Sequence, residues 1–349
     1  MIGRRTIQIL AMWPLTLLAL TQAGSAAPSS HADIQGTLPG VNLPSGSFGS
    51  DGNARERDYT YPTKADIDYY TGKGFKIFRI SFLTKRVLRP AGTDRFNPTE
   101  DMKILTELID YAATKGTNVI LDMHDYGLSF SGKLIGRDPG ASEEFAAAWE
   151  TIASEVAQKP NVVFGVMNEP NRQTAAEWLE GANAGVAAIR RAGAKQLVLV
   201  PGSHWDSAHT WTTTDNAEVM LGFRDPEENF AFEAHQYLDG DNSGSHASVA
   251  PGSGTTRLAA FTEWARKNGV RGFLGEFGWA ANDAAQKEGR DLLCFIRANQ
   301  DVWLGWTYWA GGPWWGDYMF SIEPLDGADR PQISVLSEFV TPKAAPSCS

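Results

Sequence analysis

The chain of 349 residues contains only two cysteines, Cys294 and Cys348. Neither lies in a cluster with metal-ligand spacing, so the sequence gives no support to a structural zinc site, and we expect no metal. In an exported protein, the two thiols favour a disulfide that ties the C-terminal tail to the helical stretch around Cys294. Two independent free thiols are the alternative.

Positive charge is also scarce. The chain has 31 lysines and arginines against 41 aspartates and glutamates, which gives a formal net charge of −10, and it shows no long run of one sign. Proteins that bind nucleic acid or anionic membrane surfaces usually concentrate positive charge. Neither is therefore expected as a partner of this protein.

Long hydrophobic runs are missing apart from one near the start of the chain. Arg4 and Arg5 precede the apolar run 7–20, and small residues follow at 23–27, an order typical of a secretory signal peptide. The run is shorter than the roughly 20 residues of a membrane-spanning helix, so a membrane anchor is only the alternative. We therefore predict a signal peptide over residues 1–27 and a secreted protein, extracellular or periplasmic. Residues 28–349 then form one catalytic domain with a short tail, which we expect to be a monomer.

Motifs that bind cofactors or metals are absent as well. Neither a G-x-G-x-x-G motif nor a phosphate-binding loop follows the first predicted strand, so no nucleotide cofactor is expected. The H-E-x-x-H spacing of metalloproteases is also missing. A metal hydrolase is still an enzyme alternative, with ligands drawn from Asp122, His124, Asp125, His235, Asp239 and Asp241.

The chain is rich in helical patterns that alternate with short apolar runs. Helical periodicity predicts helices over 63–73, 101–115, 142–158, 174–191, 255–267 and 283–299. Apolar runs predict strands over 40–43, 76–82, 118–124, 162–168, 196–202, 230–237, 271–277 and 302–309. Eight strands alternating with helices predict an α/β fold, the (β/α)8 TIM barrel, rather than an open doubly wound sheet.

Side chains that can take part in catalysis or binding lie where the predicted strands end. Glu169 and Glu276 each close a glycine-containing apolar run, and a carboxylate at such a position is costly to bury unless it has a partner. In a barrel the strand ends converge on one mouth, which brings residues far apart in sequence together. The loops 127–141 and 239–254 are expected to lie over this mouth. The other candidates at strand ends are Arg79, His124, Asn168, Trp205, His235, Tyr237 and Trp309.

Two carboxyl groups across one mouth suit the cleavage of an acetal. One group protonates the leaving oxygen while the other faces the anomeric carbon, and their separation decides between direct attack and attack by water. Arg79 could hold one glutamate ionised, and burial could keep the other protonated. Tyr237 could orient a carboxylate, and Asn168 could bond a sugar hydroxyl. Each of these residues alone has a structural explanation, but their joint position favours a glycosidase.

The abundance of tryptophan is a second indication of a sugar-binding site. Indole rings stack on the apolar faces of sugar rings. Trp303 and Trp306 lie inside a predicted strand and are expected in the core. The tryptophans expected as sugar platforms lie at or beyond strand ends: Trp205, Trp279, Trp309, Trp314 and Trp315.

The motifs VMNEPN, AHQYLDGDNSGSH, GEFGW and WTYWAGGPWWGDY resemble those of glycoside hydrolase family 5, especially its endo-β-1,4-glucanase branch. The resemblance covers nearly all of the mature chain, from residue 40 to 324. It implies that Glu169 is the general acid/base and Glu276 the nucleophile of a retaining reaction. Asp125 departs from the family, where asparagine commonly follows the histidine. The supporting and sugar-binding positions implied by the resemblance are Arg79, His124, Asn168, His235, Tyr237 and Trp309.

Together these patterns predict a retaining endo-β-1,4-glucanase that cleaves cellulose and related soluble β-glucans without a cofactor. The same mechanism acting on β-mannan, xyloglucan or mixed-linkage glucan is the first alternative, because loop shape decides between such polymers. A carbohydrate-binding barrel without activity is the non-enzyme alternative.

Overall fold

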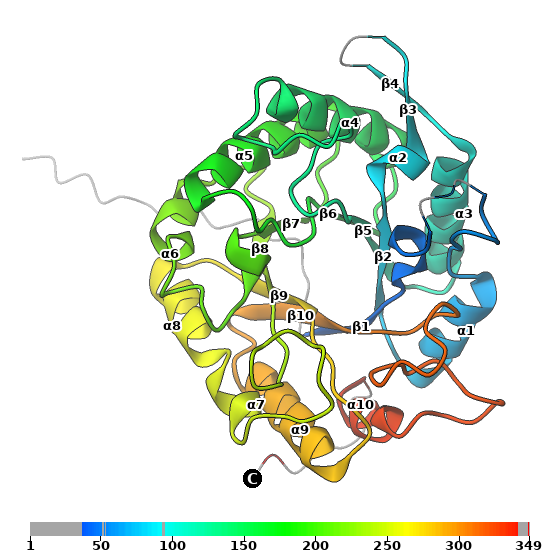
Figure 1. The fold of residues 1–349 in the computed structure, drawn as a ribbon, viewed down its shortest axis with the longest axis vertical. Helices are drawn as coiled ribbons and strands as arrows, with labels where there is room; N and C mark the ends of the chain where they lie inside the picture. Colours follow the sequence, from blue (N-terminus) through cyan, green and yellow to red (C-terminus); the bar gives the residue numbers. More distant parts are fainter. Residues whose placement is uncertain (1–36, 51, 53, 93–94, 341–347, 349) are drawn as a thin grey trace, which may run out of the picture. The chain divides into compact units, whose positions relative to one another are not determined.

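The computed structural model describes residues 37–50, 52, 54–92, 95–340 and 348. The predicted signal peptide lies outside these residues. Eight parallel strands close into a barrel in the order β1-β10-β9-β8-β7-β6-β5-β2, which confirms the predicted fold (Figure 1). The barrel strands are β1 (Leu38–Asn42), β2 (Ile77–Phe82), β5 (Asn118–Met123), β6 (Val162–Gly165), β7 (Val198–Pro201), β8 (Phe230–His235), β9 (Gly272–Glu276) and β10 (Trp303–Tyr308).

Helices surround the ring of strands (Figure 1). The long ones start and stop close to the predicted positions because the sequence carries cap residues: Thr63 and Thr174 form capping boxes, and Gly116, Gly193 and Gly269 adopt the left-handed conformation after helices. None of the helices in the described part of the chain is long and apolar enough to cross a membrane. The major helices are α1 (Lys64–Lys73), α3 (Glu100–Thr114), α4 (Ala141–Val156), α5 (Ala175–Arg191), α8 (Ala259–Asn268), α9 (Asp283–Ala298) and α10 (Gln332–Val340).

Several short elements have no counterpart among the predicted ones. A hairpin of two three-residue strands, β3 (Leu88–Pro90) and β4 (Phe96–Pro98), follows β2 and lies beside α4. The predicted helix 255–267 is in fact two helices, because the chain breaks between α7 (Ser253–Thr256) and α8. The remaining short elements are η1 (Pro44–Ser47), α2 (Thr84–Val87), η2 (His204–Asp206), α6 (Asn216–Val219) and η3 (Met220–Gly222).

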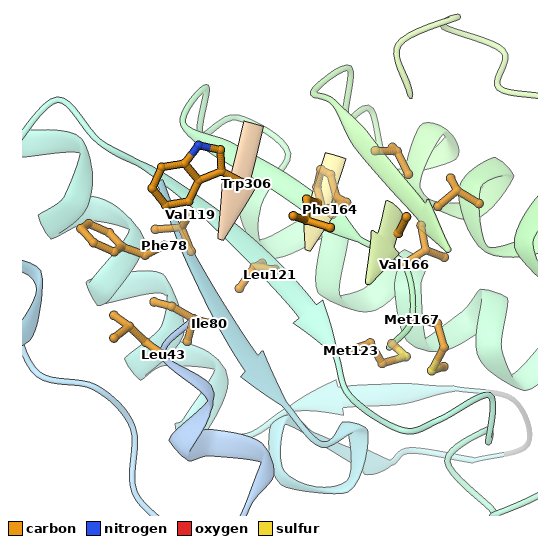
Figure 2. Packing of buried hydrophobic residues seen from close by; sticks show 14 of the residues in the cluster. Leu43, Phe78, Ile80, Val119, Leu121, Met123, Phe164, Val166, Met167 and Trp306 are labelled. Atoms are coloured by element: carbon orange, nitrogen blue, oxygen red, sulfur yellow. The ribbon is translucent and has the colours of Figure 1, made fainter. Parts of the chain in front are cut away.

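Alternate strand residues form two cores. One face of each strand packs against the helices, as Phe78 and Ile80 do in β2 and Leu121 in β5 (Figure 2). The opposite face forms a smaller cluster within the ring of strands, to which Ile77 and Ile120 belong. Trp303 and Trp306 are buried in the larger core, as expected.

A buried polar layer lies directly above the small apolar cluster. Side chains two positions apart on a strand share one face, so the residues that follow Ile77, Ile120 and Ala231 by two positions point to the same side as these apolar residues. Those residues are Arg79, Asp122 and Glu233, and each is fully buried. The fold therefore places charge inside the barrel near the carboxyl ends of its strands.

A disulfide joins Cys294 in α9 to Cys348, the pairing favoured from the sequence. It closes a sequence separation of 54 residues.

Candidate active site

A cleft of about 530 Å³ opens at the carboxyl ends of the strands. Its lining includes both glutamates singled out from the sequence, and residues of the loop 239–254 also line it. The side chains and backbone that line it come from six strand ends: His124, Tyr126, Glu169, His204, Trp205, Ser207, Thr210, His235, Tyr237, Asp241, Asn242, Ser243, Gly244, Glu276, Trp309 and Tyr318.

Arg79 holds the buried carboxylates beneath the cleft together. Its Nη2 donates to Asp122 Oδ1 at 2.9 Å, and its Nε lies 3.0 Å from Glu233 Oε1. Its Nη1 donates to Glu276 Oε1 at 2.9 Å. A single guanidinium thus faces three carboxylates, which explains why these acidic groups can be buried at all.

Glu276 is held from both of its oxygens. Arg79 bonds Oε1, and the hydroxyl of Tyr237 donates to Oε2 at 2.8 Å. Burial alone would raise the pKa of Glu276, but the positive charge of His235, followed by that of Arg79, lowers it below its ordinary value. Glu276 is therefore kept as a carboxylate.

The surroundings of Glu169 raise its pKa, in contrast to those of Glu276. It follows β6 with a positive φ of 43°, a conformation that costs about 1–3 kcal/mol and is tolerated where the surroundings enforce it. Its Oε1 lies 2.8 Å from His235 Nδ1. Burial raises the pKa of Glu169, and the nearby charge of Glu276 adds to the rise against the opposing hydrogen bond from His235. This group therefore carries a proton more readily than an ordinary glutamate.

The two carboxyl groups are close together. One oxygen of Glu169 and one of Glu276 lie within 4.8 Å of each other, and both lie within that distance of a His235 ring nitrogen. Paired carboxyl groups with pKa values moved in opposite directions can act as an acid and a nucleophile. The close approach leaves little room for a water between them.

An aromatic wall stands beside this pair. The indole of Trp309 stacks on His124 with ring centroids 6.0 Å apart and an interplanar angle of 17°. His124 Nδ1 lies 2.7 Å from Asp122 Oδ2, and the hydroxyl of Tyr126 lies 3.2 Å from His124 Nε2. The carboxylate of Asp122 therefore fixes the orientation of the imidazole.

The other predicted site residues take different positions. Trp205 lines the cleft and is 54% exposed, so its ring is free to meet a ligand. Asn168 is buried and its Oδ1 accepts a hydrogen bond from Arg79 at 2.9 Å. Trp314 and Trp315 are not among the residues that line the cleft. Trp315 packs against Trp309, with ring centroids 5.4 Å apart.

One expectation was wrong. Trp279 is fully buried rather than a sugar platform, because its indole turns back toward α9, where its Nε1 donates to Gln286 Oε1 at 3.0 Å. Gly289 leaves room for that ring, since a Cβ there would lie 2.3 Å from the indole. The loop 127–141 follows the carboxyl end of β5, and none of its residues is among those that line the cleft. Gln173 Nε2 donates to the carbonyl oxygen of Gly127 in this loop at 2.6 Å.

The unusual Asp125 points away from the cleft wall. Its Oδ2 accepts hydrogen bonds from the backbone N–H of Thr84, at 2.8 Å, and from the Thr84 hydroxyl. Burial raises the pKa of Asp125 against these bonds. Its contacts are thus made with the start of α2, and its neighbour His124 is the residue that reaches the cleft.

Some lining residues were missed from the sequence. Tyr126, Ser207 and Thr210 lie on loops and His204 on the three-residue η2, segments that are too short or irregular to give a periodic signal. Glu233 was missed although a visible signal existed, since it is an acidic residue within the otherwise apolar β8.

Two groups of side chains in the described part of the chain could hold a metal ion by their geometry. One consists of Glu169, His235 and Glu276, and the other of Asp239, Asp241 and His246. The carboxylate of Asp239 already accepts backbone N–H groups from Gly244, Ser245 and His246, so it organises its own loop. Both groups are thus explained by contacts within the protein.

Comparison with known proteins agrees with this geometry. The family model for cellulase, glycosyl hydrolase family 5, matches residues 36–312. Endo-β-1,4-glucanase B of Emericella nidulans is 36% identical over 318 residues, which cover 89% of this chain and 94% of the relative.

Solved structures share the fold. An endo-β-1,4-glucanase from Xanthomonas axonopodis pv. citri aligns with a TM-score of 0.83 and 34% identity, covering 87% of this chain and 98% of that one. Pseudomonas stutzeri endoglucanase Cel5A in complex with cellobiose aligns with a TM-score of 0.79 and 33% identity, over 87% and 92% of the two chains. The chain therefore belongs to glycoside hydrolase family 5, in its cellulase branch, and is a glycoside hydrolase.

Proposed function

We propose that this enzyme is a retaining endo-β-1,4-glucanase that cleaves internal bonds of cellulose and related soluble β-glucans. The observation that carries the proposal is the pair formed by Glu169 and Glu276, with oxygens within 4.8 Å and pKa values moved in opposite directions. Retaining glycosidases keep their carboxyl groups about 5–5.5 Å apart, whereas inverting enzymes need about 6.5–9.5 Å.

The reaction runs in two steps. In the first, Glu276 attacks the anomeric carbon while Glu169 gives its proton to the leaving oxygen, and a glycosyl ester forms on Glu276. In the second, the carboxylate of Glu169 takes a proton from water, which attacks the same carbon and releases Glu276. Arg79 and Tyr237 stabilise the carboxylate of Glu276 before and after the ester exists.

The substrate class rests on the names of the relatives and on the aromatic side chains of the cleft. Relatives covering most of this chain are endo-β-1,4-glucanases, and one solved neighbour holds cellobiose. Trp205 and Trp309 both line the cleft, and indole rings stack on the apolar faces of sugar rings. Trp314, 38% exposed, could extend this surface.

The experiment that tests the assignment compares Glu276→Gln with Glu143→Gln, an exposed glutamate of α4. We expect Glu276→Gln to lower the release of reducing ends from soluble cellulose by about a thousandfold or more, because the nucleophilic carboxylate is lost. Glu143→Gln keeps the parental rate. A folded Glu276→Gln enzyme with the parental rate would refute the assignment.

A polysaccharide panel separates the remaining substrates. We expect the highest kcat/KM on β-1,4-glucan. Faster cleavage of β-mannan, xyloglucan or mixed-linkage glucan would move the assignment to that polymer, and binding without any cleavage would favour a carbohydrate-binding barrel. We further propose that the enzyme is exported by its N-terminal signal, which mass determination of the mature chain from the culture medium or periplasm would test.

A further inference from the structure

One buried carboxylate near the acidic pair has no part in the two-step reaction. Asp206 is fully buried at the end of η2, and neither of its side-chain oxygens has a hydrogen bond of good geometry among the described residues. An unpartnered buried carboxylate is costly, so its presence calls for a compensating charge. The nearest cationic nitrogen is Nδ1 of His235, 3.5 Å from Asp206 Oδ1.

The backbone is strained to put Asp206 there. His204, Trp205 and Asp206 have positive φ values of 56°, 61° and 41° in succession. Residues other than glycine adopt this conformation at a cost of about 1–3 kcal/mol each. The same turn exposes Trp205 at the cleft and directs Asp206 inward.

His235 is surrounded by acceptors on both ring nitrogens. Nδ1 faces Glu169 Oε1 at 2.8 Å, Asp206 Oδ1 at 3.5 Å and Glu276 Oε2 at 3.7 Å, while Nε2 faces Glu233 Oε1 at 3.4 Å. Ionised carboxylates only accept hydrogen bonds, and a neutral imidazole has a single N–H. Both nitrogens can donate only when the ring is an imidazolium.

We propose that Asp206 is a positioning residue that keeps His235 an imidazolium and competes with Glu169 for its Nδ1–H. The proposal rests on the proposed function, because it gives Asp206 a part in the two proton transfers of Glu169. While Glu169 is the neutral acid, Asp206 is the ionised acceptor nearest to Nδ1. After Glu169 has given up its proton, its carboxylate accepts the same N–H, so His235 stays charged in both states.

The electrostatic surroundings agree with this pairing. Burial alone would lower the pKa of His235, but Asp206 is the largest contributor that raises it, and the pKa of His235 ends well above its ordinary value. Burial raises the pKa of Asp206 well above its ordinary value, and the charges of Glu169, Glu233 and Glu276 add to the rise. The charge of His235 opposes the rise, so His235 is the neighbour that favours the ionised form of Asp206. The charged groups that act on Asp206 are His235 and Glu233 on β8, Glu169 after β6, Glu276 on β9 and Arg79 on β2.

The test uses Asp206→Asn in the full chain. Asparagine keeps the size of the side chain and tolerates a positive φ, so the turn is preserved while the charge is lost. Asp225→Asn is the matched control, since Asp225 is also a buried aspartate but pairs with Arg190 at 2.7 Å away from the cleft.

The direct readout is the ¹⁵N NMR titration of His235, assigned by the signals lost in His235→Gln. In the parent enzyme we expect both ring nitrogens to stay protonated well above the ordinary pKa of histidine, and in Asp206→Asn we expect the pKa of His235 to fall by about one unit or more. A parental His235 that titrates near its ordinary pKa of about 6.5 would overturn the proposal without any variant. An unchanged titration in Asp206→Asn would also overturn it.

The kinetic readout is the pH profile of kcat/KM on soluble β-1,4-glucan. We expect the alkaline limb of Asp206→Asn to move up by about one pH unit, because a neutral His235 no longer lowers the pKa of Glu169. The limb of Asp225→Asn stays in place, and an equal shift in that control would contradict the proposal. Inactivity of the parent on β-1,4-glucan would refute the proposed function alone, since the NMR titration needs no substrate.

Discussion

Glu169 and Glu276 have the same side chain and different surroundings. Glu276 accepts from Arg79 and Tyr237 and lies near the charge of His235, which together hold its pKa low despite burial. The side chain of Glu169 is bonded by His235 instead, and burial raises its pKa. Activity therefore requires a pH above the pKa of Glu276 and below that of Glu169, which predicts a bell-shaped profile.

Tyr237→Phe tests the acid side of that profile. The substitution removes the hydroxyl that donates to Glu276 Oε2, and a hydrogen bond to a charged group is worth about 1.5–3 kcal/mol. The pKa of Glu276 should rise, so the acidic limb of kcat/KM should move up by about one pH unit. Tyr111→Phe removes a hydroxyl from the exposed Asp68 instead and should leave both limbs unchanged. An acidic limb that does not move in Tyr237→Phe would contradict the role given to the tyrosine hydroxyl at Glu276.

Arg79→Met tests how the buried acids are tolerated. The substitution leaves Asp122, Glu233 and Glu276 without their common cation, and breaking a buried ion pair costs about 3–5 kcal/mol. Urea unfolding at neutral pH should show a loss of this size in the free energy of unfolding.

The loss should depend on pH in a definite direction. Without Arg79 the folded-state pKa values of the three carboxyl groups exceed their unfolded values, so the destabilisation is greatest at high pH and shrinks as pH falls through the raised values. Arg190→Met leaves one buried carboxylate, that of Asp225, without its cation, and it should therefore cause a smaller loss in the free energy of unfolding. A pH-independent loss in Arg79→Met would show that packing, and not charge, is the cause.

At the scale of elements, the alternation of side chains between the two faces of each strand positions the site. Ile77, Ile120 and Ala231 form the apolar layer, and the residues two positions further along each strand form the buried polar layer. On β9 the equivalent place beside Glu233 is occupied by Gly275, whose missing side chain makes room for that carboxylate. Strand register and a small residue therefore place Glu233 next to Arg79.

Gly275→Ala tests that arrangement. A Cβ at residue 275 would lie 2.1 Å from Glu233 Oε1, so the carboxylate must move away from Arg79. We expect a loss of about 1–3 kcal/mol in the free energy of unfolding together with a fall in kcat. Gly72→Ala, in α1, places its new Cβ with no heavy atom within 4 Å and should instead stabilise the protein by about 0.5–1 kcal/mol. Equal stability changes in the two variants would show that Gly275 is not needed to make room for Glu233.

The sequence predicted those elements whose patterns are regular. Apolar runs and cap residues such as Thr63 and Gly269 located the barrel strands and the long helices, because periodicity and capping are local properties. The acidic pair was predicted because barrel closure follows from the alternation of strands and helices. Trp279 was misplaced because its position past a strand end could not show that its ring turns back toward Gly289. Asp206 and Tyr126 were missed because their left-handed backbones lie in loops without a pattern.

At the scale of the whole molecule, the disulfide between Cys294 and Cys348 ties the end of the chain to α9. Its 54-residue separation includes β10 and α10, so the bond restrains the unfolded chain over the closing part of the barrel. Cys348→Ser should lower the free energy of unfolding by about 2–4 kcal/mol, measured by thermal and urea denaturation. Cys294→Ser should give a similar loss, since either change removes the same bond. Parental stability in Cys348→Ser would show that the bond contributes nothing.

The closed barrel also brings Glu169 and Glu276 together from strands that are not neighbours in the ring, since β7 and β8 lie between β6 and β9. The central claim is that this close pair cleaves glycosidic bonds with retention. The most direct measurement is ¹H NMR of the anomeric protons during the first minutes of cello-oligosaccharide hydrolysis, before mutarotation. The β-anomer should appear first at the new reducing end. Initial appearance of the α-anomer would show inversion and would contradict the assignment of Glu276 as the nucleophile.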